Sequence, residues 1–133
     1  FAEALYLDPA ERTYIEEIGA ANFLALKGNT LMTPDSPSIL PSITRDSLMR
    51  IAAEIFGWPT EERKIALAEL DDLDAAACCG TAAIVSWIER IVRGEQEWTF
   101  PYDERWEQLH DELVGIQTAT HDDPFGWRHA VPI

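Results

Sequence analysis

The segment from Pro34 to Pro41, PDSPSILP, constrains the fold of this chain more than any other stretch. It contains three prolines in eight residues. Proline has no amide hydrogen to donate and its ring fixes φ, so the segment cannot be a helix interior or a central strand. It is therefore predicted to be a loop that leads into the next element.

The residues after this loop have the clearest helical pattern in the sequence. Ser42 or Thr44 can cap the start of the helix. Apolar residues then recur at the spacing i, i+3, i+4 and i+7, which gives one apolar face made of Leu48, Ile51, Ala52 and Ile55. Gly57 and Pro59 are expected to end the helix.

The rest of the chain predicts alternating hairpins and helices. Residues 12–18 and 22–26 are expected to be extended, and a turn at 27–29 returns the chain along 30–33. Further along, the patterns predict a strand at 63–67, an acidic helix at 68–76, a strand at 82–91, a turn at 93–95, a return strand at 97–100, a long helix at 102–119 and an irregular tail from residue 121. This is a mixed α+β fold, expected to form a single domain over residues 1–133.

Composition excludes several classes of function. The net charge of −14 argues against a nucleic-acid partner, because such binding relies on clustered Lys and Arg. No apolar run approaches the length of a membrane span, and the N-terminus does not resemble a signal peptide. Unpaired cysteines suit a reducing compartment, so a cytoplasmic protein is expected.

Two adjacent cysteines, Cys78 and Cys79, are the only ones in the chain. Neighbouring cysteines form a disulfide with each other only under severe strain. No Cys-x-x-Cys spacing accompanies them, and the three histidines follow no ligand pattern. They are predicted to be packing residues, and a metal or thiol-redox protein is kept as a competing hypothesis.

Three short motifs are compatible with a site for an anionic ligand. In Gly80-Thr81-Ala82, small residues beside a hydroxyl let backbone amides approach an anion. Ser42-Ile43-Thr44-Arg45 opens a helix, where unpaired amides and the helix dipole favour phosphate. If Glu17, in Glu16-Glu17, points inward, it needs a cationic partner. Each motif alone also fits an ordinary turn or helix cap.

The order of these motifs resembles a known family. The runs YIEEIGAANF, TPDSPSILPSITRDSLMRIA and CGTAAIVS, with FPYDERWEQLHDELVGIQ and DPFGW after them, resemble the C-terminal portion of branched-chain amino acid aminotransferases. These are enzymes of fold type IV that use pyridoxal 5′-phosphate (PLP). The resemblance runs from about residue 5 to residue 127 and implies part of that family's large domain.

The resemblance implies a role for individual residues that hold the cofactor. Glu17 matches the glutamate that binds the pyridine nitrogen of PLP, which would supply its missing cationic partner. Ile43 and Thr44 match the residues that hold the PLP phosphate at a helix start. Thr81 matches a second phosphate-binding residue.

The resemblance also implies where the substrate lies. The backbone amides of Thr81 and Ala82 match those that receive the substrate carboxylate, and Ala20 and Ala21 match residues that line the side-chain pocket. The implied reaction is amino transfer between Leu, Ile or Val and 2-oxoglutarate, in an enzyme of this family expected to be a homodimer.

The Schiff-base lysine of the family lies upstream of the glutamate motif, and neither Lys27 nor Lys64 matches it. No catalytic residue is therefore assigned here. The chain alone is expected to be inactive, as the C-terminal part of such an enzyme that is either truncated or paired with a separate N-terminal piece. Alternatives are a non-catalytic fragment or pseudoenzyme, a D-amino acid aminotransferase and an aminodeoxychorismate lyase.

Overall fold

The computed structural model describes residues 3–132, so that residues 1, 2 and 133 of the expected domain lie outside it. Within that range one sheet contains seven strands: β1 (Leu5–Leu7), β2 (Ile15–Ile18), β3 (Ala21–Lys27), β4 (Thr30–Pro34), β5 (Thr60–Arg63), β6 (Ala75–Gly80) and β7 (Ile84–Trp87). A separate hairpin pairs β8 (Arg90–Arg93) with β9 (Gln96–Thr99). The helices are α1 (Ile43–Glu54), the 3₁₀ helix η1 (Leu67–Asp72) and α2 (Glu104–Gln117). The mixed α+β class is thus confirmed.

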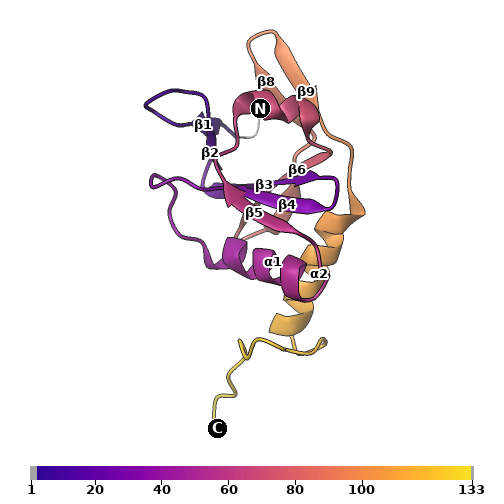
Figure 1. Ribbon diagram of the computed structural model, residues 1–133. Coiled ribbons are helices and arrows are strands. Elements are labelled where there is room, and N and C mark those ends of the chain that lie inside the picture. The colour runs from indigo at the N-terminus through magenta and orange to yellow at the C-terminus, as the bar shows by residue number, and fades with distance from the viewer. Residues whose placement is uncertain (1–2, 133) are drawn as a thin grey trace.

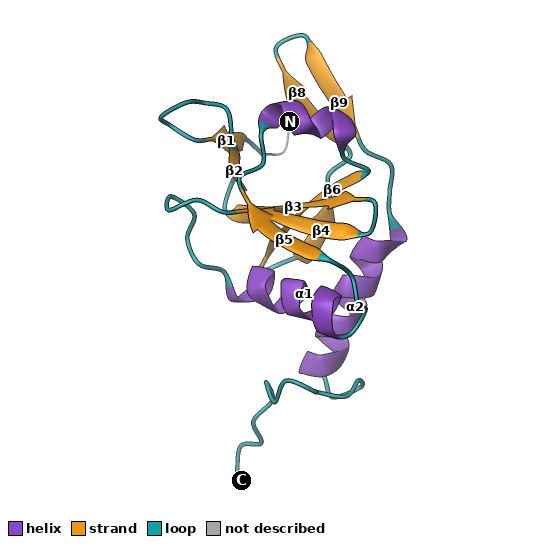
Figure 2. Ribbon diagram, in the orientation of Figure 1, coloured by secondary structure: helices purple, strands orange, loops and turns teal. Residues whose placement is uncertain are grey.

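The elements form three layers, with the seven-stranded sheet in the middle (Figures 1 and 2). The helices α1 and α2 cover one face, whereas η1 and the β8–β9 hairpin cover the other. Side chains alternate along β3, so that Leu24 and Leu26 pack toward α1 and α2 while Phe23 and Ala25 pack on the opposite side. Each face therefore has its own apolar core.

Strand β3 is the branch point of the sheet. Ala25 pairs with Met32 of β4 on one side and with Ala76 of β6 on the other. Asn22 pairs with Glu17 of β2 and also with a residue of β6. Since β6 occupies one edge of β3, β2 and β4 must both lie along the other edge.

The predicted loop, first helix and first hairpin are confirmed. Ser42 caps α1, and its Oγ accepts a hydrogen bond of 3.1 Å from the amide of Arg45. The β3–β4 turn is made by Gly28 and Asn29, and Gly28 has a φ of +58°, which a residue with a Cβ rarely adopts. The second long helix is also present, although it is shorter than predicted.

The predicted acidic helix at 68–76 is wrong in its second half. The helical segment ends at Asp72, and Ala75–Gly80 is the central strand β6. Its alanines favour a helix locally, but the strand is covered on both faces and paired on both edges. Small residues suit a strand packed between two layers, so tertiary packing overrides helix propensity here.

Two predicted strands also differ from the structure. The strand expected at 63–67 lies at Thr60–Arg63, where it runs parallel to β4. All four residues of this strand are polar or charged, which is typical of an exposed edge strand. The sequence therefore shows no alternation of apolar and polar residues from which the strand could be predicted. The strand expected at 82–91 is divided between β7 and β8, which belong to different sheets.

The packing of β3 predicts a large difference between two leucine substitutions. Leu26 is fully buried, whereas Leu40 is 76% exposed. We expect Leu26→Ala to lower the free energy of unfolding by about 3 kcal/mol through lost burial and a residual cavity. The control Leu40→Ala should change it by less than about 0.5 kcal/mol. Urea denaturation monitored by circular dichroism measures both, and equal effects would contradict the core assignment.

Candidate functional site

The first turn of α1 presents two amides that are free to bind an anion. Ser42 satisfies the amide of Arg45, and the first bond within the helix is donated by the amide of Asp46. Among the described residues, no hydrogen bond uses the amides of Ile43 or Thr44. Together with the helix dipole, they form a suitable cradle for a phosphate.

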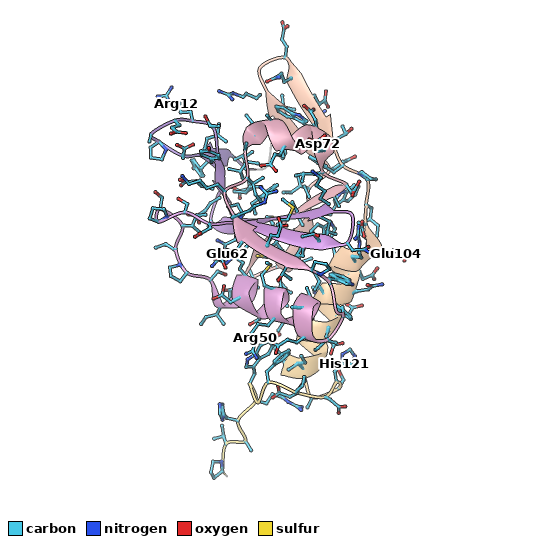
Figure 3. All side chains as sticks on the ribbon, viewed as in Figure 1. Arg12, Arg50, Glu62, Asp72, Glu104 and His121 are labelled. Atoms are coloured by element: carbon cyan, nitrogen blue, oxygen red, sulfur yellow. The ribbon has the colours of Figure 1, made fainter. Side chains whose placement is uncertain are left out.

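A buried arginine fixes this turn against the sheet. Arg45 is only 8% exposed, and its guanidinium contacts Asp46 at 3.2 Å and Glu62 of β5 at 3.4 Å. Glu62 is labelled in Figure 3 and belongs to β5. Because the guanidinium is shared between two carboxylates, it ties this turn to β5 and adds no net positive charge beside the free amides.

Glu17 faces the same side of the sheet as α1. It lies opposite Asn22, which in turn lies opposite Cys79, and residues opposite each other in a sheet share a face. Cys79 packs in the core beneath α1 and α2, and the charge of Arg45 acts on its thiol. The half-buried carboxylate of Glu17 and the start of α1 are therefore on one face.

The residues expected to bind substrate lie at one end of this sheet. Strand β6 ends at Gly80, directly before Thr81 and Ala82. A Cβ placed on Gly80 would lie 3.9 Å from the Cβ of Ala21, which begins β3. Ala20 belongs to the preceding turn, so Ala21 and its neighbour Ala20 lie at the end of the sheet where the segment after β6 begins.

Polar groups at this end of the sheet lack partners. In residues 3–132, the side chains of Glu17, Thr44 and Thr81 make no hydrogen bond or ion pair. Thr81 and Ala82 are exposed, and Thr44 is half-buried. An open surface with a free carboxylate, free hydroxyls and free amides is suited to a ligand that carries both a cationic and an anionic group.

Sequence reasoning missed one feature of this surface. Ile84, directly after the turn at residues 81–83, has a φ of +61°. A β-branched side chain rarely adopts this left-handed conformation, which costs about 1–3 kcal/mol. No residue type signals it, because isoleucine is the opposite of what such a position favours.

The cysteines behave as packing residues. Cys79 is buried, and burial raises the pKa of its thiol to about 12. Burial also raises the pKa of Cys78. Within the described part of the chain, no group of three or more His, Cys, Asp or Glu residues could hold a metal ion, and no helix is long and apolar enough to cross a membrane.

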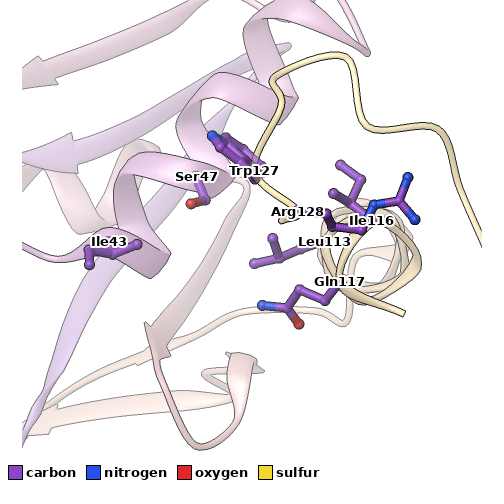
Figure 4. Close-up of a pocket in the computed structure, with 7 residues that line it drawn as sticks. All are labelled: Ile43, Ser47, Leu113, Ile116, Gln117, Trp127 and Arg128. Carbon is purple, nitrogen blue, oxygen red and sulfur yellow. The ribbon is translucent and has the colours of Figure 1, made fainter. Parts of the chain in front are cut away.

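One cavity lies elsewhere, between α1, α2 and the C-terminal segment (Figure 4). Its volume is about 420 Å³, and it is lined by Ile43, Ser47, Leu113, Ile116, Gln117, Trp127 and Arg128. A second cavity of about 220 Å³ lies beside β2 and the loop after β4. Neither of these two cavities is lined by Glu17, which is half-buried, or by Thr81, which is exposed.

Comparison with known proteins identifies the family. The profile of amino-transferase class IV proteins matches residues 1–91. The chain belongs to the class IV aminotransferase family. It is 42% identical over 132 residues to a branched-chain-amino-acid aminotransferase of Haemophilus influenzae and 41% identical over 129 residues to that of Helicobacter pylori. Each match covers 96% of this chain and 38% of the relative, so the chain spans well under half the length of these class IV proteins.

Solved structures of the family match the fold. The branched-chain aminotransferase of Escherichia coli gives a TM-score of 0.79 at 28% identity, covering 94% of this chain and 41% of that one. The PLP form of the Thermobaculum terrenum enzyme gives 0.76 at 32% identity, covering 90% and 38%. A 4-amino-4-deoxychorismate lyase from Pseudomonas aeruginosa gives 0.68 at 30% identity, covering 84% and 39%.

The raised thiol pKa predicts slow alkylation. The thiolate is the reactive species, so a pKa of about 12 leaves almost none of it at pH 8. We expect iodoacetamide at pH 8 to leave Cys79 unmodified in the folded protein and to modify it fully in urea. Peptide mass spectrometry measures both states. Modification of folded Cys79 as fast as a free cysteine would contradict the burial.

Proposed function

We propose that this chain forms the cofactor-binding part of a PLP-dependent branched-chain amino acid aminotransferase. The observation that carries the proposal is the combination, on one face of the sheet, of an unpaired carboxylate at Glu17 and two unpaired amides at Ile43 and Thr44. PLP carries a protonated ring nitrogen and a phosphate, which are the two groups that these residues can bind.

The start of α1 would hold the phosphate. The free amides of Ile43 and Thr44 donate to phosphate oxygens, and the dipole of the helix favours the negative charge. The hydroxyls of Thr44 and Thr81 are additional donors without a partner in the described structure. Arg45 keeps this turn fixed against β5, so the donors stay in place when the anion binds.

Glu17 would bind the ring nitrogen. A carboxylate in hydrogen-bond contact keeps the proton on that nitrogen, because the ion pair favours both charged forms. When bound, PLP supplies an electron-accepting ring that stabilises negative charge at the substrate α-carbon. Since Glu17 is half-buried and makes no hydrogen bond or ion pair in residues 3–132, its carboxylate is free for this role.

The segment after β6 would receive the substrate. The amides of Thr81 and Ala82 would donate to the substrate carboxylate, and the strained residue that follows would hold this turn in one conformation. Ala20 and Ala21 have side chains small enough to leave room for a branched aliphatic group. This favours Leu, Ile and Val as amino donors, with 2-oxoglutarate as the acceptor.

The reactive amine would come from outside these residues. Lys27 ends β3 at the exposed hairpin turn, and Lys64 lies 5.0 Å from the Tyr14 ring, next to the second cavity. Neither position is on the face that carries Glu17 and the α1 cradle. We therefore propose that a lysine elsewhere in the complete enzyme completes the site, within a cytoplasmic homodimer, and that this chain alone is inactive.

Replacement of Glu17 tests the proposal. In the complete polypeptide that contains this chain, we expect Glu17→Gln to lower the rate of amino transfer from L-leucine to 2-oxoglutarate by at least about 100-fold, because the amide cannot hold the ring proton. The control Glu95→Gln alters an exposed residue of the β8–β9 turn and should leave the rate unchanged. A Glu17→Gln variant as active as the wild type would refute the role.

The substrate preference of the complete polypeptide provides a second test. L-Leucine, L-isoleucine and L-valine are expected to be better donors than D-alanine, and 4-amino-4-deoxychorismate is expected not to release pyruvate. Preference for D-alanine would indicate a D-amino acid aminotransferase, and pyruvate release would indicate a lyase.

The lysine that supplies the reactive amine can be located directly. After borohydride reduction of the PLP-loaded complete polypeptide, we expect the pyridoxyl group on a lysine outside residues 1–133. Peptide mass spectrometry locates it. A specific adduct on Lys27 or Lys64 would overturn the inactivity proposed for this chain alone.

A further inference from the structure

The neighbour of the half-buried Glu17 is a buried carboxylate with no assigned role. Glu16 is 7% exposed, and it accepts a hydrogen bond of 3.0 Å from the hydroxyl of Ser36. Within residues 3–132 it makes no ion pair. It lines the second cavity together with Lys64, and Ser36 is its hydrogen-bond partner, so the contact with Ser36 is what holds this buried carboxylate in place.

Glu16 lies where two strands of the sheet diverge. Strands β2 and β4 share one edge of β3, and β4 ends close to β2 before the chain enters the loop at residues 35–42. Figure 1 shows this loop extending beside the β1–β2 side of the sheet before it enters α1. The bond between Glu16 and Ser36 joins the two branches at this point.

The bond organises the start of the loop. The oxygen of Ser36 accepts a 3.2 Å bond from the amide of Ser38 while its hydroxyl donates to Glu16. The carbonyl of Ser36 accepts a further bond from the amide of Ile39. A carboxylate is only an acceptor, so it fixes the direction of the Ser36 hydroxyl and holds the turn at residues 36–39.

This turn is connected to the phosphate cradle by a stiff linker. Only Leu40 and Pro41 separate it from Ser42, the cap of α1. Pro41 fixes φ within this linker and restricts the backbone of Leu40 before it, while Pro37 restricts the turn itself. A displacement of Ser36 is therefore transmitted to the amides of Ile43 and Thr44.

We propose that Glu16 is a positioning residue, which through Ser36 sets the distance between the Glu17 carboxylate and the phosphate cradle of α1. Consecutive strand residues point to opposite faces, so Glu17 is left free for the ring nitrogen while Glu16 holds the loop on the other side. This inference rests on the proposed function. It assigns to the Glu16-Glu17 pair two separate tasks, one at each end of the same cofactor.

Cofactor binding by the complete polypeptide tests the inference, with PLP and its phosphate-free analogue pyridoxal as probes. We expect Glu16→Ala and Ser36→Ala each to weaken PLP binding about tenfold, the effect of losing one hydrogen bond to a charged group. Pyridoxal binding should change less than twofold, because it does not use the α1 cradle. A merely structural defect would weaken both probes equally and would overturn the proposal.

Further variants separate the bond from the charge. Glu16→Gln keeps an acceptor for Ser36 and should restore PLP affinity to within about twofold of the wild type. The double variant Glu16→Ala with Ser36→Ala should be no weaker than either single variant, since both remove the same bond. Ser38→Ala changes an exposed hydroxyl of the same loop and is the matched control.

The outcomes distinguish failure of the Glu16 positioning role from failure of the proposed function on which it rests. A wild-type protein that fails to bind PLP would remove the proposed function and this inference together. Wild-type binding with unchanged affinity in Glu16→Ala and Ser36→Ala would overturn the positioning role alone. Additive losses in the double variant would also contradict it, because the two side chains would then act independently.

Discussion

The pairing of β3 with β6 is the interaction on which the rest of the structure depends. Five consecutive residue pairs join the two strands, from Asn22 opposite Cys79 to Leu26 opposite Ala75. The β6 residues are alanines and cysteines, which are small enough for helices to pack closely on one face and for η1 and a hairpin to pack on the other. Both cores pack against the paired strands β3 and β6. Without this pairing neither core could form, and the start of α1 would have no fixed position relative to Glu17.

Local chemistry predicted the elements that depend on a few neighbouring residues. The proline-rich loop, the Ser42 cap and the glycine turn each follow from backbone constraints that act within about four positions, and all three are present. The elements that were wrong depend on distant partners. Ala75–Gly80 is a strand only because β3 and β7 flank it, and Thr60–Arg63 is a strand only because β4 offers a free edge.

The features of the candidate site likewise fall into those that the sequence predicted and those that depend on contacts between distant segments. Sequence motifs indicated Glu17, the start of α1 and the segment after β6, because each carries groups of recognisable chemistry. The burial of Arg45, the left-handed Ile84 and the bond between Glu16 and Ser36 could not be predicted, since they arise where segments far apart in sequence meet. The site is thus built from local donors held in place by non-local contacts.

The C-terminal segment gives α1 a second attachment. Gly115 leaves space for the ring of His121, which lets the chain fold back across α2. Phe125 and Trp127 then stack on each other, with the Arg50 guanidinium of α1 over the Phe125 ring at 4.5 Å. The two helices and this segment therefore contact one another at the end of the molecule that carries the C-terminus. A ligand bound at the first turn of α1 would therefore lie on the same helix as the Arg50 contact, about two helical turns away, and next to the cavity that Trp127 and Arg128 line.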